Sequence, residues 1–296
     1  MTGDEVTAVV VTRNRAEHLV ATLAHLDGVA RNIIVVDNAS TDGTSEHARR
    51  QYPSVRVVRL PENCGAAART VGVREALTAF VAFSDDDSWW ESGSLERGVS
   101  ALRSDPQLGL VAARVLVGPL RRLDPASRVM QHSPLSPVSG VAGRRVLGFV
   151  ACAAICRRDA YLACGGFHPR YGIGGEEALL AVDLAVNGYS CAYLDDVVAY
   201  HHPARAANGR PDARRLRMTA RNDMWTSWLR LPLKVALART AGIARGPQGP
   251  SALISALRGA GWVARERRPV DPRLVDELEL LRLSDGGREP STSGGD

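Results

Sequence analysis

Three consecutive acids, Asp85, Asp86 and Asp87, follow an apolar run that is typical of a buried strand, residues 79–84. If the three residues stay extended, their side chains alternate between the faces of the strand, so Asp85 and Asp87 point to one side. Two carboxylates at a strand tip suit Mg²⁺ or Mn²⁺, which keep several waters and are held by one or two carboxylates and by substrate phosphates. An isolated acidic triplet also fits a solvated turn, so its context in the chain decides between the two interpretations.

The segments before the triplet alternate between strand and helix patterns. β-branched runs mark the strands and apolar residues at helical spacing mark the helices. The order is strand 6–12, helix 16–26, strand 33–37, strand 55–60, helix 66–78 and strand 80–84. This alternation predicts an α/β fold, with a mostly parallel sheet and helices on both of its faces. Polar residues at the strand ends, at 12–14, 37–38 and 85–87, then meet at one edge, where ligands bind.

The patterns beyond the triplet predict further elements and a long loop. They are a helix at 94–102, a strand at 108–117, an apolar block at 146–156, a helix at 178–186 and a strand at 191–200. Residues 119–145 lose periodicity and contain four prolines, which predicts a long loop. Trp225 and Trp228 share one face of a later helix, which Pro232 interrupts.

The chain is expected to have three parts. They are an α/β domain at 1–220, a helical basic extension at 221–283 and a disordered tail at 284–296, which is low in apolar residues. The five cysteines are odd in number and form no C-x-x-C pair, which favours reduced thiols and a cytoplasmic protein. The first twenty residues predict a strand and not a signal peptide. No apolar stretch reaches the length of a membrane span.

Basic side chains gather in the C-terminal third. Residues 201–268 hold fourteen Arg and Lys against three acids, although the whole chain carries a net charge of only +5. With the nearby tryptophans, this surplus suggests peripheral contact with the inner face of an anionic membrane. A helix docked on the α/β domain is the alternative that we favour. Arg outnumbers Lys by 36 to 1, which indicates the GC-rich codon usage of some bacteria.

Five segments, in this order and spacing, resemble the family-2 nucleotide-sugar glycosyltransferases of the GT-A fold. They are VVVTRNR at 9–15, IIVVDNASTDGT at 33–44, PENCGAAARTVGV at 61–73, FSDDDSWW at 83–90 and GGFHPRYGIGGEEALLAVDLAVNGY at 165–189. Each segment alone is a modest signal, but the ordered set is specific. The resemblance covers about residues 6–202 and thins after them.

The resemblance implies a nucleotide site at the strand ends. Thr12, Arg13 and Asp37 would cradle the nucleotide, with Asp37 accepting a hydrogen bond from the base. Arg69 would contact the donor diphosphate or base, because a planar guanidinium matches phosphate oxygens. The alternative for Asp37 is a helix cap or an Asx-turn, and the alternative for Arg69 is a surface role.

The resemblance also implies a metal site, in which the acidic triplet is the family's D-x-D. Asp87 would bind Mg²⁺ or Mn²⁺ directly, Asp85 would lie near the ion, and Asp85 or Asp86 would reach the ribose or base. Some relatives with a similar Tyr-His place the histidine that corresponds to His201 on the metal, and a hydrogen-bonded structural histidine is the alternative. The cation would neutralise the leaving nucleoside diphosphate.

Glu176 and Glu177 match the family's Glu-Asp pair, whose second acid is the general base. Glu177 is one methylene longer than the family's Asp. Glu176 is therefore an alternative candidate for the base, because the length of each side chain determines which carboxylate contacts the acceptor hydroxyl. Both residues also fit the acidic first turn of a helix.

Together these assignments imply an inverting glycosyltransferase that uses a divalent cation and a nucleoside-diphosphate sugar. Its acceptor would be a glycan, a lipid-linked molecule or a small molecule, and no nucleic-acid partner is expected. One alternative is a nucleotidyltransferase on a related sheet. It is disfavoured because no glycine-rich phosphate loop with Arg and Lys follows the first strand. The other is a non-catalytic protein that binds nucleotide sugars.

Overall fold

The computed structural model describes residues 5–138, 140–203 and 212–286. Within these ranges the strands form one mixed sheet in the order β3-β2-β1-β4-β9-β6-β10-β5, with β7 paired to β6 and β8 paired to β10. The strands are β1 (Val6–Thr12), β2 (Asn32–Asp37), β3 (Arg56–Arg59), β4 (Phe80–Asp85), β5 (Ser88–Trp90), β6 (Leu108–Val117), β7 (Arg122–Leu123), β8 (Arg144–Val146), β9 (Ala154–Arg157) and β10 (Ser190–His201).

The long pairings of the sheet are parallel. β1 lies between β2 and β4, with Val10 opposite Val35 and Ser84, while β2 pairs with β3 and β6 pairs with β10. β9 is antiparallel to both of its neighbours, β4 and β6. Two antiparallel steps restore the direction, so β4, β6 and β10 run the same way. Their carboxyl ends therefore share one edge of the sheet with those of β1 and β2.

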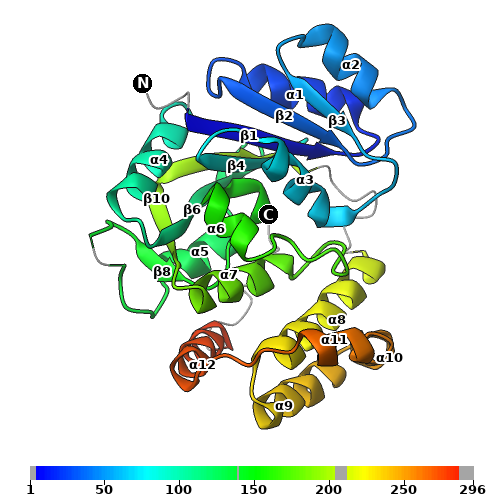
Figure 1. Ribbon diagram of the computed structural model, residues 1–296, viewed down its shortest axis with the longest axis vertical. Helices are drawn as coiled ribbons and strands as arrows, with labels where there is room; N and C mark the ends of the chain where they lie inside the picture. The colour runs from blue at the N-terminus through cyan, green and yellow to red at the C-terminus, as the bar shows by residue number, and fades with distance from the viewer. Residues whose placement is uncertain (1–4, 139, 204–211, 287–296) are drawn as a thin grey trace.

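Helices cover both faces of the sheet (Figure 1). They are α1 (Ala16–Leu26), α2 (Thr44–Gln51), α3 (Ala68–Glu75), α4 (Ser94–Ser104), α5 (Pro125–Gln131), α6 (Arg158–Ala163), α7 (Glu176–Val186), α8 (Ala213–Arg230), α9 (Leu233–Ala244), α10 (Gly249–Leu257), α11 (Ala260–Glu266) and α12 (Pro272–Gly286), with 3₁₀ turns η2 (Gly65–Ala67) and η3 (Ala151–Ala153). Buried leucines of α1 and α4 pack on one face. Helices α3, α6 and α7 pack on the other. Both faces are therefore buried, which explains why the central strands are apolar runs.

Most predicted elements of the α/β domain are confirmed. The strands at 6–12 and 108–117 and the helix at 16–26 have the predicted bounds, as β1, β6 and α1. Unbroken β-branched runs and an apolar stripe at helical spacing each specify one period, so the pattern alone decides these elements.

The prediction of an unbroken loop at 119–145 is wrong, because β7, α5 and the start of β8 lie in it. The side chain of Asp124 accepts a hydrogen bond from the N–H of Ala126 at 2.7 Å, and Pro125 stands in the first turn of α5. A proline at this position begins a helix, because its missing N–H would have had no partner inside the helix. The prediction assumes that all four prolines interrupt regular structure, whereas Pro125 begins a helix.

Helices α8–α12 form a layer against α7 and the loop that precedes it (Figure 1). Trp225 is buried with Tyr171 and Leu179 in one apolar cluster, so the favoured docked helix is confirmed. As predicted, Pro232 separates two helices, α8 and α9. The boundary expected after residue 220 falls inside α8.

The chain end and the membrane prediction can be compared only over part of the sequence. Helix α12 continues to Gly286, past the start that we expected for the tail, and residues 287–296 lie outside the described residues. In the described ranges, no helix combines the length and the apolar character that a bilayer crossing requires.

Candidate active site

A cavity of about 510 Å³ lies at the carboxyl edge of the sheet. It brings together every predicted site residue except Asp37, namely Thr12, Arg13, Arg69, Asp85, Asp86, Asp87, Glu176, Glu177 and His201. Strand ends and the residues that follow them supply the threonine, Arg13, the three aspartates and the histidine, while α3 supplies Arg69 and α7 the two glutamates. Arg15 and Arg215 also line the cavity, and the sequence did not single them out.

The acidic triplet does not stay extended. β4 ends at Asp85, and residues 86–87 form a turn that leads into β5. The hydroxyl of Ser88 accepts a hydrogen bond from the N–H of Asp85 at 2.7 Å, which closes this turn. The expected alternation, with Asp85 and Asp87 on one side, is therefore wrong. Asp86 and Asp87 are the two acids that share a partner.

That partner is Arg15. Its Nη1 lies 2.8 Å from Asp86 Oδ1 and 2.9 Å from Asp87 Oδ2, and Thr12 donates a hydrogen bond to Asp86 Oδ2 at 2.8 Å. Burial raises the pKa of Asp86 to about 6, although Arg15 and Thr12 oppose the shift. Burial also acts to raise the pKa of Asp87, but His201 and Arg15 outweigh it and hold that pKa below its usual value. Asp87 is thus the more strongly ionised acid of the turn.

The residues expected to bind metal have suitable donor chemistry. His201 Nε2 lies 3.4 Å from Asp87 Oδ1, and Asp85 is ion-paired with Arg69. Burial alone would lower the pKa of His201, but the carboxylates of Asp87 and Asp85 outweigh it and raise the pKa. No group of three or more His, Cys, Asp or Glu side chains in the described part of the chain is arranged as a metal cage. Carboxylate and imidazole donors fit Mn²⁺ that keeps water and ligand oxygens in its other positions.

Two arginines that line the cavity carry buried donors without a hydrogen-bond partner in the described part of the chain. Arg69 is 7% exposed, and its Nε finds no hydrogen-bond partner among the described residues. The same holds for Nη2 of Arg15. A buried donor without a partner is costly, so a ligand that supplies acceptors is favoured here. The oxygens of a diphosphate are such acceptors, and a guanidinium matches their geometry.

Glu176 and Glu177 begin α7, directly after two glycines with left-handed backbone, Gly174 at φ 97° and Gly175 at φ 86°. Glu176 is buried, and its Oε2 has no hydrogen-bond partner in the described ranges. Burial raises the pKa of both carboxyls, and the charge of Glu177 adds to the shift of Glu176. A carboxyl with a raised pKa is a better proton acceptor near neutral pH than an ordinary one, which suits a general base.

Helix α8 belongs to the layer formed by α8–α12. It holds in place the glycine-rich loop, residues 171–175, that leads into α7. Asn222 is fully buried, and its Nδ2 donates to the carbonyl oxygens of Tyr171 at 2.9 Å and Gly174 at 2.6 Å. Arg221 donates to the same Tyr171 carbonyl at 2.7 Å. These bonds fix the path of the chain into α7 and hence the position of the two glutamates. No sequence pattern predicts these bonds, because the acceptors are backbone atoms on a distant segment.

Asp37 does not line the cavity. Its carboxylate accepts hydrogen bonds from the N–H of Ser40 at 2.8 Å and from the hydroxyl of Ser45, which are the contacts of the Asx-turn alternative. The neighbouring Asn38 does line the cavity, and its Nδ2 donates to the carbonyl oxygen of Gly65 at 3.1 Å. A contact between Asp37 and a nucleotide base stays a prediction.

Comparison with known proteins gives a consistent result. The profile of the family described as glycosyl transferase family 2 matches residues 7–164. A relative from Mycobacterium tuberculosis, N-acetylglucosaminyl-diphospho-decaprenol L-rhamnosyltransferase, is 24% identical over 280 residues, which cover 79% of this chain and 89% of the relative. The glycosyltransferase AglE from Haloferax volcanii is 30% identical over 177 residues, which cover 58% of this chain and 57% of that protein.

Solved structures share the fold. The mannosyltransferase PcManGT from Pyrobaculum calidifontis, in complex with GDP-Man and Mn²⁺, matches with a TM-score of 0.59 and 21% identity, over 96% of this chain and 87% of that one. TarS from S. aureus, in complex with UDP-GlcNAc, matches with a TM-score of 0.57 and 15% identity, over 81% and 70% of the two chains. At these identities the likeness establishes the fold alone, and the GT-A type expected from the sequence is confirmed.

Proposed function

The chain belongs to glycosyl transferase family 2, and we propose that it is an inverting, metal-dependent enzyme that moves a sugar from a nucleoside-diphosphate sugar to an acceptor hydroxyl. One observation carries this proposal. A single cavity gathers an acidic turn, two arginines with unpaired donors and two glutamates with raised pKa values. These are the groups needed to hold a metal-bound diphosphate and to take a proton from a nucleophile.

The donor would be held mainly through its diphosphate. Arg69 Nε and Arg15 Nη2 are the donors that its oxygens would satisfy. Thr12 and Arg13, at the end of β1, would lie beside the nucleoside, with Arg13 presenting an exposed guanidinium. Asp87 and His201 would hold the divalent cation, with Asp85 near them, and the bound cation supplies Lewis-acid stabilisation of the departing diphosphate.

Glu177 would act as the general base, with Glu176 buried beside it. Glu177 takes the proton of the acceptor hydroxyl while that oxygen attacks the anomeric carbon from the face opposite the diphosphate. The new C–O bond forms as the bond from the anomeric carbon to the diphosphate oxygen breaks, so the anomeric configuration is inverted. Holding both substrates in line contributes as much as the proton transfer, which is why the fixed position of α7 matters.

Donor hydrolysis tests the proposed reaction. Incubation with uridine, thymidine and guanosine diphosphate sugars and Mn²⁺ should release free sugar and nucleoside diphosphate from at least one of them, because water can replace the acceptor. Chromatography of the products identifies the donor. Pyrophosphate released from a nucleoside triphosphate would indicate a nucleotidyltransferase instead. Binding without any product would indicate a non-catalytic protein.

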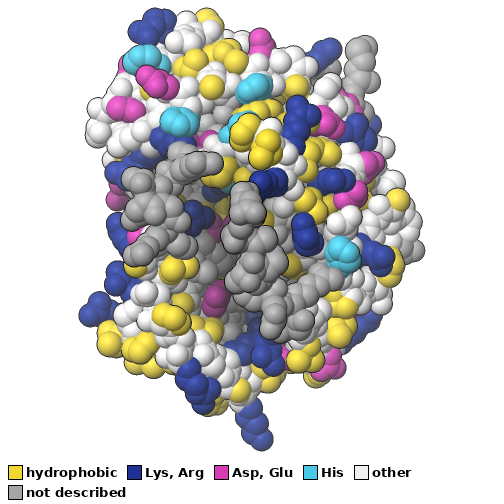
Figure 2. Space-filling view, turned by 180° about the vertical axis from the view of Figure 1, so that it is seen from behind, with side chains coloured by type: hydrophobic (Ala, Val, Ile, Leu, Met, Phe, Trp, Pro, Cys, Tyr) yellow, Lys and Arg dark blue, Asp and Glu magenta, His cyan; other side chains and the backbone are white. Residues whose placement is uncertain are grey.

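We further propose a lipid-linked acceptor and a cytoplasmic protein that makes peripheral contact with the membrane. The name of the mycobacterial relative refers to a decaprenol-linked acceptor of that protein. Trp225 is buried and cannot touch a membrane, which corrects our expectation that the tryptophans supply the apolar surface. Exposed aliphatic side chains of α9 and α10 take that place, namely Leu233, Leu237, Ile254 and Leu257. Over the C-terminal helices, at the lower end of Figure 2, basic and apolar side chains are interspersed with few acids.

The membrane proposal predicts salt-sensitive binding to anionic vesicles. Basic residues near a charged surface contribute up to about 1 kcal/mol each and are screened within a Debye length. Co-sedimentation with phosphatidylglycerol vesicles should therefore occur at low salt and decrease at high salt. The double variant L233E/L237E should no longer pellet. The control variant is L77E. Leu77 is 95% exposed and lies just before β4, at the edge of the sheet opposite the candidate active site, so L77E should pellet like the unmodified protein. No pelleting at low salt, or equal pelleting with neutral lipid, would contradict the proposal.

A further inference from the structure

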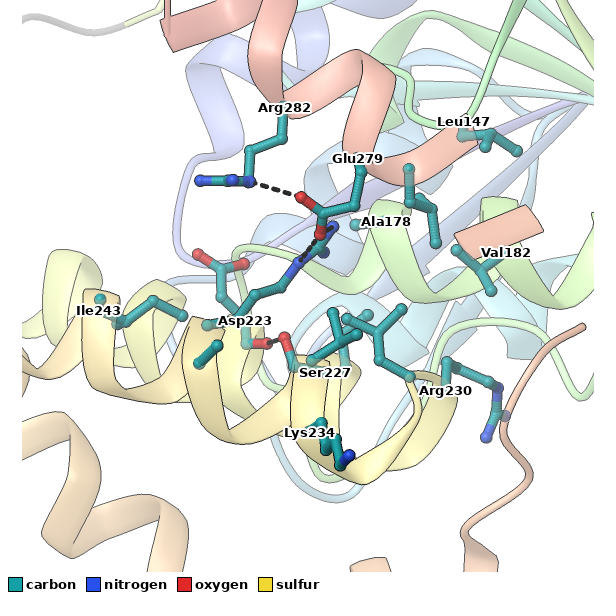
Figure 3. A pocket seen from close by; sticks show the side chains of 17 residues that line it. Leu147, Ala178, Val182, Asp223, Ser227, Arg230, Lys234, Ile243, Glu279 and Arg282 are labelled. Carbon is teal, nitrogen blue, oxygen red and sulfur yellow. Dashed lines mark hydrogen bonds and ion pairs between the residues drawn. The ribbon is translucent and has the colours of Figure 1, made fainter. Parts of the chain in front are cut away.

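A second cavity lies between α7 and the C-terminal helices α8, α9 and α12 (Figure 3). Its volume is about 720 Å³, which exceeds that of the candidate active site. Aliphatic side chains from α7, α9 and α12, from the loop before η3 and from the residue that follows α8 line it, namely Leu147, Val182, Leu231, Val235, Ile243 and Leu278. None of the residues given a role in the reaction proposed above lines this cavity.

The lining is suited to a hydrocarbon chain. Among the described residues, no aromatic ring lines this cavity. Sugars and nucleobases are usually bound on aromatic faces with several hydrogen-bonding groups around them. A flexible aliphatic chain needs only apolar walls, and it gains free energy from every methylene that leaves water.

The polar part of the lining favours an anion. Arg239 and Arg282 share one carboxylate, Glu279, at 2.8 and 2.9 Å, so two guanidinium charges face a single acid. Figure 3 shows Glu279 and Arg282 on α12, across the cavity from α8 and α9. Lys234 adds an exposed ammonium on α9. The cations therefore outnumber the acids, as a negatively charged headgroup requires.

The wall of the cavity includes the residue that follows the candidate base in the chain, Ala178 after Glu177. Asp223 lines it from α8, and a Cβ atom on Gly175 would lie 3.3 Å from Asp223 Oδ1. Burial raises the pKa of Asp223 to about 6, against the pull of Arg239, and the charge of Glu177 adds to the rise. The linings of the two cavities therefore include neighbouring residues at the start of α7, Glu177 in one and Ala178 in the other.

We propose that this second cavity binds the hydrocarbon chain of an anionic amphiphilic acceptor and so directs its reactive headgroup toward Glu177. The proposal rests on the proposed function, because it assigns the acceptor of that reaction to a place in the fold. It commits to one chemistry, an aliphatic chain that carries a phosphate or diphosphate. It also explains why the aliphatic cavity lies next to the glutamates and not on a distant face.

Direct binding of dodecyl phosphate below its micellar concentration tests the proposal on the full chain. Ala238 lines the cavity and is exposed, so A238W fills the cavity without unpacking the core. Ala241 lies on the same helix, is exposed and is not part of the lining, so A241W is the matched control. We expect A238W to bind dodecyl phosphate about tenfold or more weakly and A241W to bind like the unmodified protein. Octyl phosphate should bind at least about 100-fold more weakly than dodecyl phosphate, because four methylenes are lost from the buried chain.

The headgroup is tested separately. K234E should weaken the binding of dodecyl phosphate and leave that of dodecyl maltoside, which has no charge, unchanged. Equal binding by A238W and A241W, no dependence on chain length, or equal binding of inorganic phosphate would overturn the proposal. Release of nucleoside diphosphate from a donor sugar, measured on the same samples, should be unchanged in A238W and A241W. If the unmodified protein releases no nucleoside diphosphate from any donor sugar, the proposed function is rejected, regardless of how strongly dodecyl phosphate binds.

Discussion

Replacing Asp87 with Ala is expected to remove Mn²⁺-dependent binding of the donor, with an affinity loss of about 100-fold or more. Asp87 is the acid of the turn whose pKa is lowered, and it lies 3.4 Å from His201, the other proposed ligand. Removing its carboxylate leaves a single imidazole and an ion-paired Asp85, which are too few donors for a hard cation.

The fold should survive this change. Arg15 keeps its contact with Asp86 at 2.8 Å, and the carbonyl oxygen of residue 87 still accepts the hydrogen bond from the N–H of His202. Calorimetric titration with uridine, thymidine and guanosine diphosphate, each with and without Mn²⁺, measures the effect, and thermal unfolding checks the fold. D87N keeps the shape of the side chain, and it should lose most of the affinity as well. An unchanged Mn²⁺-dependent affinity in D87A would reject the metal assignment.

Replacing Glu177 with Gln should preserve donor affinity and slow transfer by about 10²-fold or more, the usual contribution of a general base. The amide keeps the size of the side chain but cannot accept the proton. E176Q is the matched variant, because Glu176 is the adjacent acid in the same turn of α7 and its pKa is also raised. It should lose much less activity. An inactive E176Q beside an active E177Q would assign the base to Glu176.

The pH profile gives an independent measurement of the same group. A general base works only when it is deprotonated, so transfer falls as the pH decreases through the pKa of the base. Burial raises the pKa of Glu177, so this fall begins at a higher pH than it would for an exposed glutamate. The acidic limb of the profile should disappear in E177Q, while a merely structural glutamate would leave it in place.

Local patterns predicted the sheet well and the side-chain geometry less well. Strand β6 follows from one unbroken apolar run, and that run needs no partner to be recognised. The turn at Asp86 could not be predicted in the same way. It depends on Ser88 and on Arg15, which lies 72 positions from Asp87 in the chain. Sequence patterns describe one segment at a time, so they do not predict contacts between segments that are distant in the chain.

The same limit applies to the residues around the cavity. Nine site residues were predicted because each stands at the end of a recognisable element or motif. Asp37 stands at such an end too, yet its carboxylate turns toward Ser40 and Ser45, since short-range hydrogen bonds compete for it. Asn222 was missed because an isolated Asn within a helix carries no signal of its own. Its role depends on backbone carbonyls that only the folded chain brings near.

The hold of Asn222 on the glycine-rich loop limits how this chain can be divided or recombined. A truncated form that ends before α8 would keep the ten strands of the described residues, but the carbonyls of Tyr171 and Gly174 would lose their buried partner. A chimera that takes its C-terminal helices from a relative would need to take the segment from Tyr171 through Glu177 from the same parent. If the C-terminal helices bind the acceptor and Glu177 is the base, as we propose, acceptor preference and base placement are inherited together, and exchanging one without the other should give a folded but poorly active hybrid.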